Sequence, residues 1–262
     1  MVVRLLSLFL LATLLSSCAS IQPIDAPEVT SSPMVDELKN IPAPVQRVPI
    51  AVYKFNDVTG QRKSGNNLAL LSSAVTQGGD IWLLQALKKA GNGEWFQVVE
   101  RMELDNLLKE RQIIRNTREL HEGDKAEKIR PLLFAGVLLT GGIVGYDTNT
   151  ETGGLGVRYL GIGISDEYRK DMVTVALRLI SVQTGEVLLA VSSQKTILST
   201  KLSATVFKFL DMGTSLLETE AGITDNESTT YAVRKAIEQA VIEIIKVGEK
   251  KKLWEFKKEE IK

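Results

Sequence analysis

The chain has 262 residues, an apolar fraction of 44% and 32 basic against 32 acidic side chains. This length allows one good-sized domain with appendages, and the apolar fraction is enough for a core. Balanced charge without a basic stripe argues against a nucleic-acid partner. Past the N-terminus the longest apolar run, Leu132–Leu139, is far shorter than the roughly 18 residues that a membrane-spanning helix needs.

The N-terminus carries the strongest local signal. Arg4 provides a positive region, Leu5–Leu14 an apolar region, and Leu15-Ser16-Ser17-Cys18 follows directly. This order resembles a bacterial lipobox, in which the cysteine receives a diacylglyceryl group. We expect residues 1–17 to be a signal peptide and Cys18, the only cysteine, to carry a covalent lipid. The alternative is an ordinary signal peptide that ends near a cysteine.

Residue Ala19, which follows the cysteine, is not the aspartate that retains lipoproteins on the inner membrane. The lipobox resemblance therefore implies an outer-membrane anchor and a periplasmic domain in a Gram-negative bacterium. Six of the seven prolines fall before residue 50, and proline favours extended backbone over packed structure. Residues 18–47 are accordingly predicted to form a lipid-anchored, proline-rich tether.

Strand and helix patterns interleave beyond the tether, which predicts an α/β domain. Residues 48–142, 173–191 and 225–262 are assigned to it. The expected strands are Val48–Asn56, Trp95–Val99, Val173–Ile180 and Val187–Val191, with a tight turn at Thr184-Gly185. Helices are expected between Asp80 and Gly91, from Leu104 to Ile114, and from about Thr230. In the last helix the apolar positions at helical spacing are Val233, Ala236, Ile237, Ala240, Val241, Ile244 and Ile245.

Two segments, 143–172 and 192–224, are rich in glycine and threonine, and each is predicted to form a β-hairpin. In the second segment apolar and polar residues alternate, so each strand has one apolar and one polar face. The arms are about ten residues long, which is the length that a tilted strand needs to cross a bilayer. The predicted membrane-facing residues are Leu198, Leu202, Ala204, Val206, Leu217, Ala221 and Ile223, and the first hairpin is predicted to turn at Gly153 and Gly154. A long arm lying on a soluble sheet is the alternative.

Strands in a bilayer cannot have free edges, because no water is present there to bind the exposed backbone groups. Each unsatisfied buried group costs about 1–3 kcal/mol, so two bare edges would outweigh the roughly 5–15 kcal/mol of net stability of a folded domain. Four strands from one chain are also fewer than the roughly eight that the smallest membrane barrels contain. If the hairpins cross the membrane, several copies must therefore join into one oligomeric transmembrane β-barrel.

Short motifs along nearly the whole chain resemble those of the CsgG family, the outer-membrane curli secretion channels. They are Val52-Tyr53 with Thr59-Gly60-Gln61, Leu107–Arg111 with Ile113–Arg115, Gly145-Tyr146, Gly153–Gly163, Lys195–Ser199 and Leu253-Trp254. The resemblance implies a nonameric, lipid-anchored barrel above a periplasmic α/β ring. It also implies secretion of unfolded curli subunits by diffusion without ATP, with a periplasmic cap (CsgE in the family) and a surface factor (CsgF) as partners.

In that family the loop after the first strand narrows the lumen with a tyrosine and an adjacent Asn-Phe pair. The matching loop here has Leu70 and Leu71 at the Asn-Phe positions, and Asn66 or Asn67 near the tyrosine. The resemblance thus implies that Asn66, Asn67, Leu70 and Leu71 line the constriction, with aliphatic groups in place of aromatic ones. The alternative is a surface loop in which Leu70 and Leu71 pack into the core.

Catalytic chemistry has little support in the sequence. His121 is the only histidine and cannot build a triad or a multi-histidine metal site. The glycines of Gly153–Gly163 lack the preceding apolar strand and following helix of a dinucleotide fingerprint. We expect no enzyme activity, metal or cofactor other than the lipid on Cys18. Two functions remain: the homo-oligomeric secretion channel, and a soluble periplasmic lipoprotein that scaffolds or regulates envelope proteins without a pore.

Overall fold

The computed structural model describes residues 34–62, 73–159, 162–209, 216–226 and 228–257. For most strand residues in the ranges 149–167 and 201–226 it describes the backbone alone. Two units are distinguished, Met1–Ser31 and Ser32–Lys262. All described residues, and therefore all the elements below, belong to the second unit.

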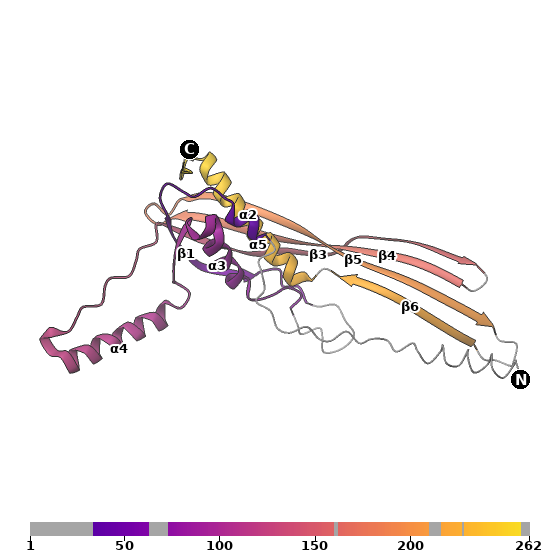
Figure 1. Cartoon of the computed structure of the whole chain (residues 1–262), viewed down its shortest axis with the longest axis horizontal. Helices are drawn as coiled ribbons and strands as arrows, with labels where there is room; N and C mark the ends of the chain where they lie inside the picture. The colour runs from indigo at the N-terminus through magenta and orange to yellow at the C-terminus, as the bar shows by residue number, and fades with distance from the viewer. Residues whose placement is uncertain (1–33, 63–72, 160–161, 210–215, 227, 258–262) are drawn as a thin grey trace, which may run out of the picture. The chain divides into compact units, whose positions relative to one another are not determined.

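The described chain forms one open mixed sheet of six strands in the order β2-β1-β3-β4-β5-β6. The strands are β1 (Val48–Asp57), β2 (Phe96–Val99), β3 (Val137–Tyr159), β4 (Ile162–Ser181), β5 (Val187–Phe209) and β6 (Leu216–Asn226). The helices are α2 (Val35–Lys39), α3 (Gly79–Lys89), α4 (Leu104–Glu122) and α5 (Thr229–Lys250), with 3₁₀ turns η2 (Ala90–Gly93) and η3 (Gly123–Lys125) (Figure 1). The predicted α/β fold of the domain is confirmed.

Strand β1 lies inside the sheet, parallel to both β2 and β3, whereas β3 to β6 pair antiparallel. An inner parallel strand is covered on both faces and therefore consists of a nearly continuous apolar run. The sequence of β1 fits this rule, since Ile50, Ala51, Val52 and Phe55 are all buried.

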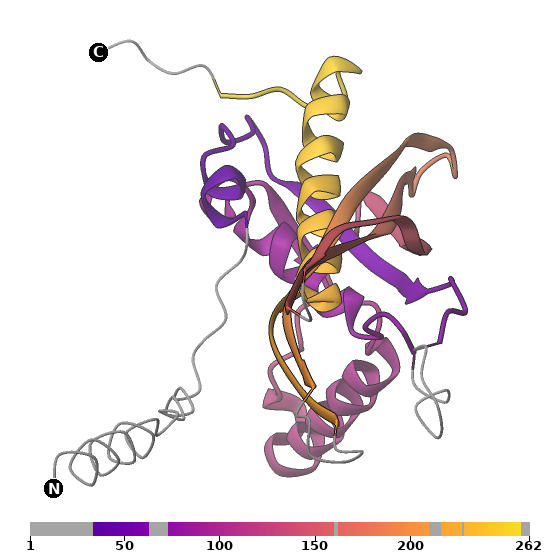
Figure 2. The same ribbon diagram turned by 90° about the vertical axis from the view of Figure 1, so that its right-hand side faces the viewer.

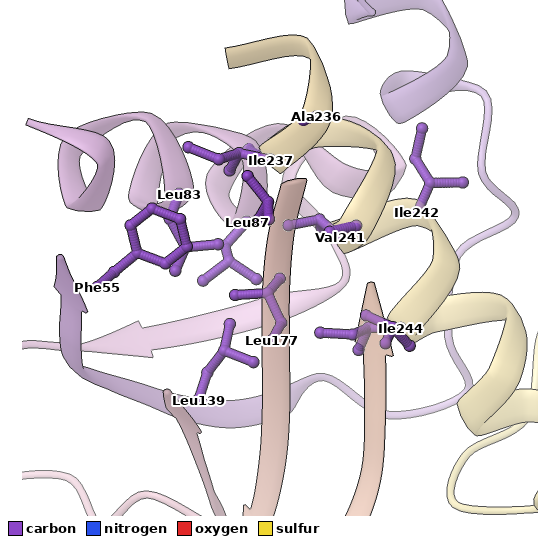
Figure 3. Packing of buried hydrophobic residues seen from close by; sticks show 14 of the residues in the cluster. Phe55, Leu83, Leu87, Leu139, Leu177, Ala236, Ile237, Val241, Ile242 and Ile244 are labelled. Carbon is purple, nitrogen blue, oxygen red and sulfur yellow. The ribbon is translucent and has the colours of Figure 1, made fainter. Parts of the chain in front are cut away.

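Helix α5 packs against β4 and β5 and covers one face of the sheet (Figure 2). All seven apolar positions predicted for its buried stripe are at most 1% exposed. Figure 3 shows Ile237, Val241 and Ile244 of this helix directed at Leu177 and Leu139 of the sheet. Helix α3 adds Leu83 and Leu87 to the same core, beside Phe55. Ile81 of the same helix is apolar but 56% exposed.

The segment before β1 is packed against the domain, so the predicted tether cannot extend to residue 47. Leu38 of α2 is fully buried and Ile41 is 8% exposed. The backbone N–H of Met34 donates to Oε2 of Glu238 at 3.0 Å, and Glu238 forms a buried ion pair with Arg234 at 3.2 Å. The Arg234 guanidinium also lies 4.5 Å from the ring centre of Trp82. A proline-rich composition was therefore misleading for residues 34–47, because α2 contributes apolar side chains to the core.

The C-terminal tail closes the same end of the domain. The indole N–H of Trp254 donates to the carbonyl of Ile245 at 2.9 Å, and the ring of Trp254 meets Trp95 edge-on at 5.6 Å. The indole N–H of Trp95 donates to the carbonyl of Pro42 at 2.8 Å. A short antiparallel contact between Pro44 and Phe256 joins the two chain ends of the described domain.

Candidate functional site

Four strands continue past the part of the sheet that the helices cover. Strand β1 pairs with β3 only as far as Asp57 opposite Ile143, and the N–H of Val58 donates to the carbonyl of Ile143 at 3.0 Å. Beyond this point the described part of the sheet consists of β3, β4, β5 and β6, and we call this part the four-stranded extension. Strands β3 and β5 have 23 residues each and β4 has 20, whereas strands in globular proteins usually have about 5–6.

The predicted hairpin segments are extensions of the domain strands and are not separate elements. Residue 143 lies within β3, residue 172 within β4, and residue 192 within β5. The expected turn at Thr184-Gly185 lies between β4 and β5, with Gly185 at φ +72°. In the second hairpin, residues 210–215 connect β5 to β6 and lie outside the described residues. Glu227, between β6 and Ser228, also lies outside them.

The first hairpin does not turn at Gly153 and Gly154, so this prediction is wrong. Both residues lie inside β3, where Gly153 pairs with Tyr168 and Gly154 with Glu167 of β4. The pairing continues to Tyr159 opposite Ile162, which leaves only residues 160 and 161, themselves outside the described residues, to connect the strands. Glycine is compatible with an extended strand as well as with a turn, so its presence alone does not locate a hairpin. A better signal is Gly161 in a gap of two residues between alternating patterns.

The register places the predicted membrane-facing positions on one face. Leu202 lies opposite Ile223, and Ala204 lies opposite Ala221. Across the other edge of β5, Ala204 lies opposite Ile164 and Leu198 opposite Lys170. Since directly opposite residues share a face of an antiparallel sheet, the seven predicted positions belong to one face of the four-stranded extension. Of these seven, the exposure is described only for Leu198, which is 46% exposed.

The apolar face changes sides along the strands. In the domain the odd-numbered residues of β4 lie under the helices, and Val173, Val175, Leu177 and Leu179 are fully buried. In the part of the strand that precedes them the same parity is polar, with Asp171, Arg169, Glu167 and Ser165. The even positions there include Tyr168, Ile164 and Ile162, together with the charged residues Asp166 and Lys170. Strand β5 reverses at the same level, from buried Val191 and Ile197 to Ser199, Lys201 and Ser203 on the odd parity.

An ion pair marks the level of this reversal. The Asp171 side chain is 3% exposed, and its Oδ2 lies 2.7 Å from Nη2 of Arg169, whose side chain is 45% exposed. The hydroxyl of Tyr146 on β3 lies 3.5 Å from the same Oδ2. Sequence patterns did not identify this pair. The signal that was present is the break in the apolar alternation of β4 at Asp171, before Val173.

The loop that carries the predicted constriction leaves the domain at the same end of the sheet. β1 ends at Asp57, whose Oδ1 accepts hydrogen bonds from the N–H and hydroxyl of Thr59 at 2.9 and 2.6 Å. Arg62 then pairs with Ser73, and the N–H of Ala74 donates to the carbonyl of Gln61 at 2.9 Å. These contacts close the base of a loop formed by residues 63–72. The predicted residues Asn66, Asn67, Leu70 and Leu71 lie outside the described residues, and so does Cys18.

Helix α4 begins at Leu104 as predicted but extends past Ile114 to Glu122, and it packs on little of its own chain. None of its residues is buried, and Leu108, Ile113 and Leu120 are 48%, 57% and 80% exposed. The segment that returns to β3 is held by hydrogen bonds from Arg111 to the carbonyl of Arg130 and from Arg118 to the carbonyl of Glu127. The apolar spacing of α4 therefore predicts a helix, but the described part of the chain does not cover its apolar side chains.

Among the described residues, none of the helices combines the length and the apolar character needed to cross a bilayer. The described part of the chain also contains no group of three or more histidine, cysteine, aspartate or glutamate side chains arranged to hold a metal ion.

A family model described as curli production assembly/transport component CsgG matches residues 32–262. The chain belongs to the CsgG family. The protein of that name from Escherichia coli K12 is 39% identical over 258 residues, covering 95% of this chain and 91% of the relative. The relative from Salmonella typhimurium LT2 is 38% identical over 248 residues, covering 93% and 88%. The relative from Citrobacter koseri is 38% identical over 250 residues, with the same two coverages. The CsgG resemblance seen in the sequence motifs is confirmed.

Proposed function

We propose that this chain is one subunit of a homo-oligomeric β-barrel channel in the outer membrane, through which unfolded curli subunits leave the periplasm without ATP. The observation that carries the proposal is the change of the apolar face along β4 and β5. The relatives named as curli production assembly/transport components support the assignment of the cargo.

The change of face has a direct physical reason in such a channel. Near the helices the sheet must direct its apolar face at α5, because burial there stabilises the fold. Beyond the helices that same face would border the water-filled lumen, and the opposite face would meet lipid, so the favourable polarity of each face is reversed. An arm lying on a soluble sheet has no reason to reverse: its apolar side would stay on the side that the protein covers.

The free edges of the extension are complementary between copies. Past Ile143, β3 has no neighbour on its outer side among the described strands, and β6 has none on its other side. Strand β3 runs out from the domain and β6 runs back, so β6 of one copy can pair antiparallel with β3 of the next. Repeating this contact around a closed ring removes every bare edge, which is what a bilayer requires. The uncovered residues of α4 provide a further surface for neighbouring copies.

The remaining parts of the proposal come from the family and the sequence. Nine copies would contribute 36 strands in total, as in the largest known barrels of about 36 strands. Residues 1–17 would be removed, and Cys18 would carry the lipid anchor. Asn66, Asn67, Leu70 and Leu71 would form the constriction, consistent with a loop whose base lies where β3 leaves the domain. A CsgE-like cap and a CsgF-like surface factor would be the accessory partners.

Labelling of single cysteines along β5 tests the proposal. Full-length lipidated protein would be reconstituted in liposomes and treated with a membrane-impermeant maleimide, with Cys18 giving little background once it is acylated. Cysteines replacing Ser203 and Thr205 should react through the lumen, whereas cysteines replacing Leu202 and Ala204 should be protected by lipid. Gln194→Cys, which is on the exposed face of the domain part of β5, is the water-facing control.

Equal labelling of positions 202 and 203 would contradict the channel. Protection of position 202 that persists in protein kept free of lipid and detergent would favour the soluble scaffold instead, since the arm would then be covered by protein.

A further inference from the structure

The ion pair of Arg169 and Asp171 lies at the point where the covered face of the sheet ends. Arg169 is opposite Ser199 of β5, and Ser199 is opposite Asn226, the last residue of β6. Helix α5 begins at Thr229, three positions after that residue. Asp171, two residues closer to the domain on the same face, is already buried at 2% exposure. Arg169 is therefore the first position of its parity on β4 beyond the region covered by the helix.

The two charges of this pair differ in their access to water. The carboxylate side chain is 3% exposed and the guanidinium side chain 45% exposed, so the positive end of the pair is directed at solvent. A guanidinium has five N–H donors. The described residues offer it one acceptor, Oδ2 of Asp171 at 2.7 Å. A fixed anchor and an exposed cationic end are the properties of a group that is held in place to interact with something in the adjacent water.

We propose that Arg169 forms a cationic ring at the periplasmic entrance of the lumen, with Asp171 as the residue that positions it. The inference rests on the channel proposed above, in which the face of Arg169 borders the lumen and each subunit contributes one copy. Rings of charged side chains determine which ions a pore favours. This ring attracts anions and the acidic segments of an unfolded polypeptide, and it repels clusters of lysine and arginine.

Salt dependence distinguishes such a field from a steric effect. The Debye length is about 30 Å at 0.01 M ionic strength and about 3 Å at 1 M. In a wide pore the ring therefore acts across much of the lumen only in dilute salt. The preference for chloride over potassium should be clear at low ionic strength and should disappear in concentrated salt.

Planar-bilayer recordings of the full-length, lipidated oligomer test the inference. Reversal potentials in a KCl gradient would be measured for the unmodified protein, Arg169→Gln and Arg169→Glu. The chloride-to-potassium permeability ratio should fall at least about twofold for Arg169→Gln in dilute salt, and further for Arg169→Glu. Both variants remove the cation that pairs with the buried carboxylate of Asp171, so folding is checked by the recovery of rings in detergent. Arg169→Lys, which keeps the positive charge, should give a permeability ratio close to that of the unmodified protein.

Arg178→Gln and Arg178→Glu are the matched controls. Arg178 lies on the same strand and is exposed, but it belongs to the opposite face and to the domain part of β4. Its variants should leave the permeability ratio unchanged. Normal conductance with the same ratio in Arg169→Glu as in the unmodified protein would overturn this inference alone. An unmodified protein that produces no conductance at all would remove the proposed channel, and the ring with it.

Discussion

Replacement of Leu202 by arginine tests whether the apolar face of the extension meets lipid. In the proposed barrel the change of face would put the membrane boundary near Leu198, and Leu202 lies four residues further along β5. At a rise of about 3.3 Å per residue this is about 13 Å of strand. With a tilt of about 40° it corresponds to about 10 Å of depth in an apolar band about 25 Å tall, which is close to the midplane.

An arginine at the midplane on the lipid face of a barrel costs about 2–4 kcal/mol. In the proposed ring every subunit would contribute the same position, so nine copies would bring the cost to about 18–36 kcal/mol. We therefore expect Leu202→Arg to abolish insertion while leaving the soluble part of each subunit folded.

The control is Ser203→Arg, which adds the same charge at the next position of the same strand. Its register position is on the polar face, opposite Gly222 and Ser165, where the proposed lumen is filled with water. The assay is the fraction of full-length protein that fractionates with the outer membrane and gives rings in detergent. Recovery of inserted rings from Leu202→Arg at the level of Ser203→Arg would refute the reasoning. Loss of rings in both variants would show that the charge acts through folding and not through lipid.

Three further changes test the constriction, the C-terminal packing and the buried ion pair. Leu71→Trp should sharply lower single-channel conductance if this loop lines the lumen, and an unchanged conductance would remove the loop from the pore. Gly248→Ala should destabilise the protein by about 1–3 kcal/mol, although alanine favours helices, because the added Cβ would lie 2.1 Å from the Trp254 ring. In a Trp254→Ala background the same change should instead stabilise it, by about 0.5–1 kcal/mol in thermal unfolding; equal effects in both backgrounds would contradict the steric explanation. Arg234→Ala should lower the free energy of unfolding by about 3–5 kcal/mol, because it leaves the buried carboxylate of Glu238 without its cation; a denaturant midpoint within error of the unmodified protein would argue against this.

Sequence periodicity predicted those elements whose burial pattern is local. All seven apolar positions of α5 were identified, because one continuous helix buries one stripe at helical spacing. The alternation along 192–224 likewise placed Leu202 and its partners on a single face, which the register of β5 with β6 and β4 supports.

Residues that act through distant contacts were not predictable in this way. The N–H of Met34 donates to Glu238, 204 residues away, so no local pattern showed that the chain packs against the domain from Met34 onward. Gly153 and Gly154 were assigned to a turn, but glycine is compatible with turns and with strands. Only the pairing with β4 shows that both residues lie in a strand. The Arg169–Asp171 pair has no sequence motif.

By itself the sequence determined the amphipathic arms, the apolar stripe of α5 and the family motifs, because each depends on residues close together in the chain. Only the tertiary structure decided which face of the sheet α5 covers, where that cover ends, and therefore where the polarity of β4 and β5 reverses. The reason is that alternation assigns residues to two faces of a strand but does not show whether protein, water or lipid contacts each face. Those contacts depend on elements that are distant in sequence.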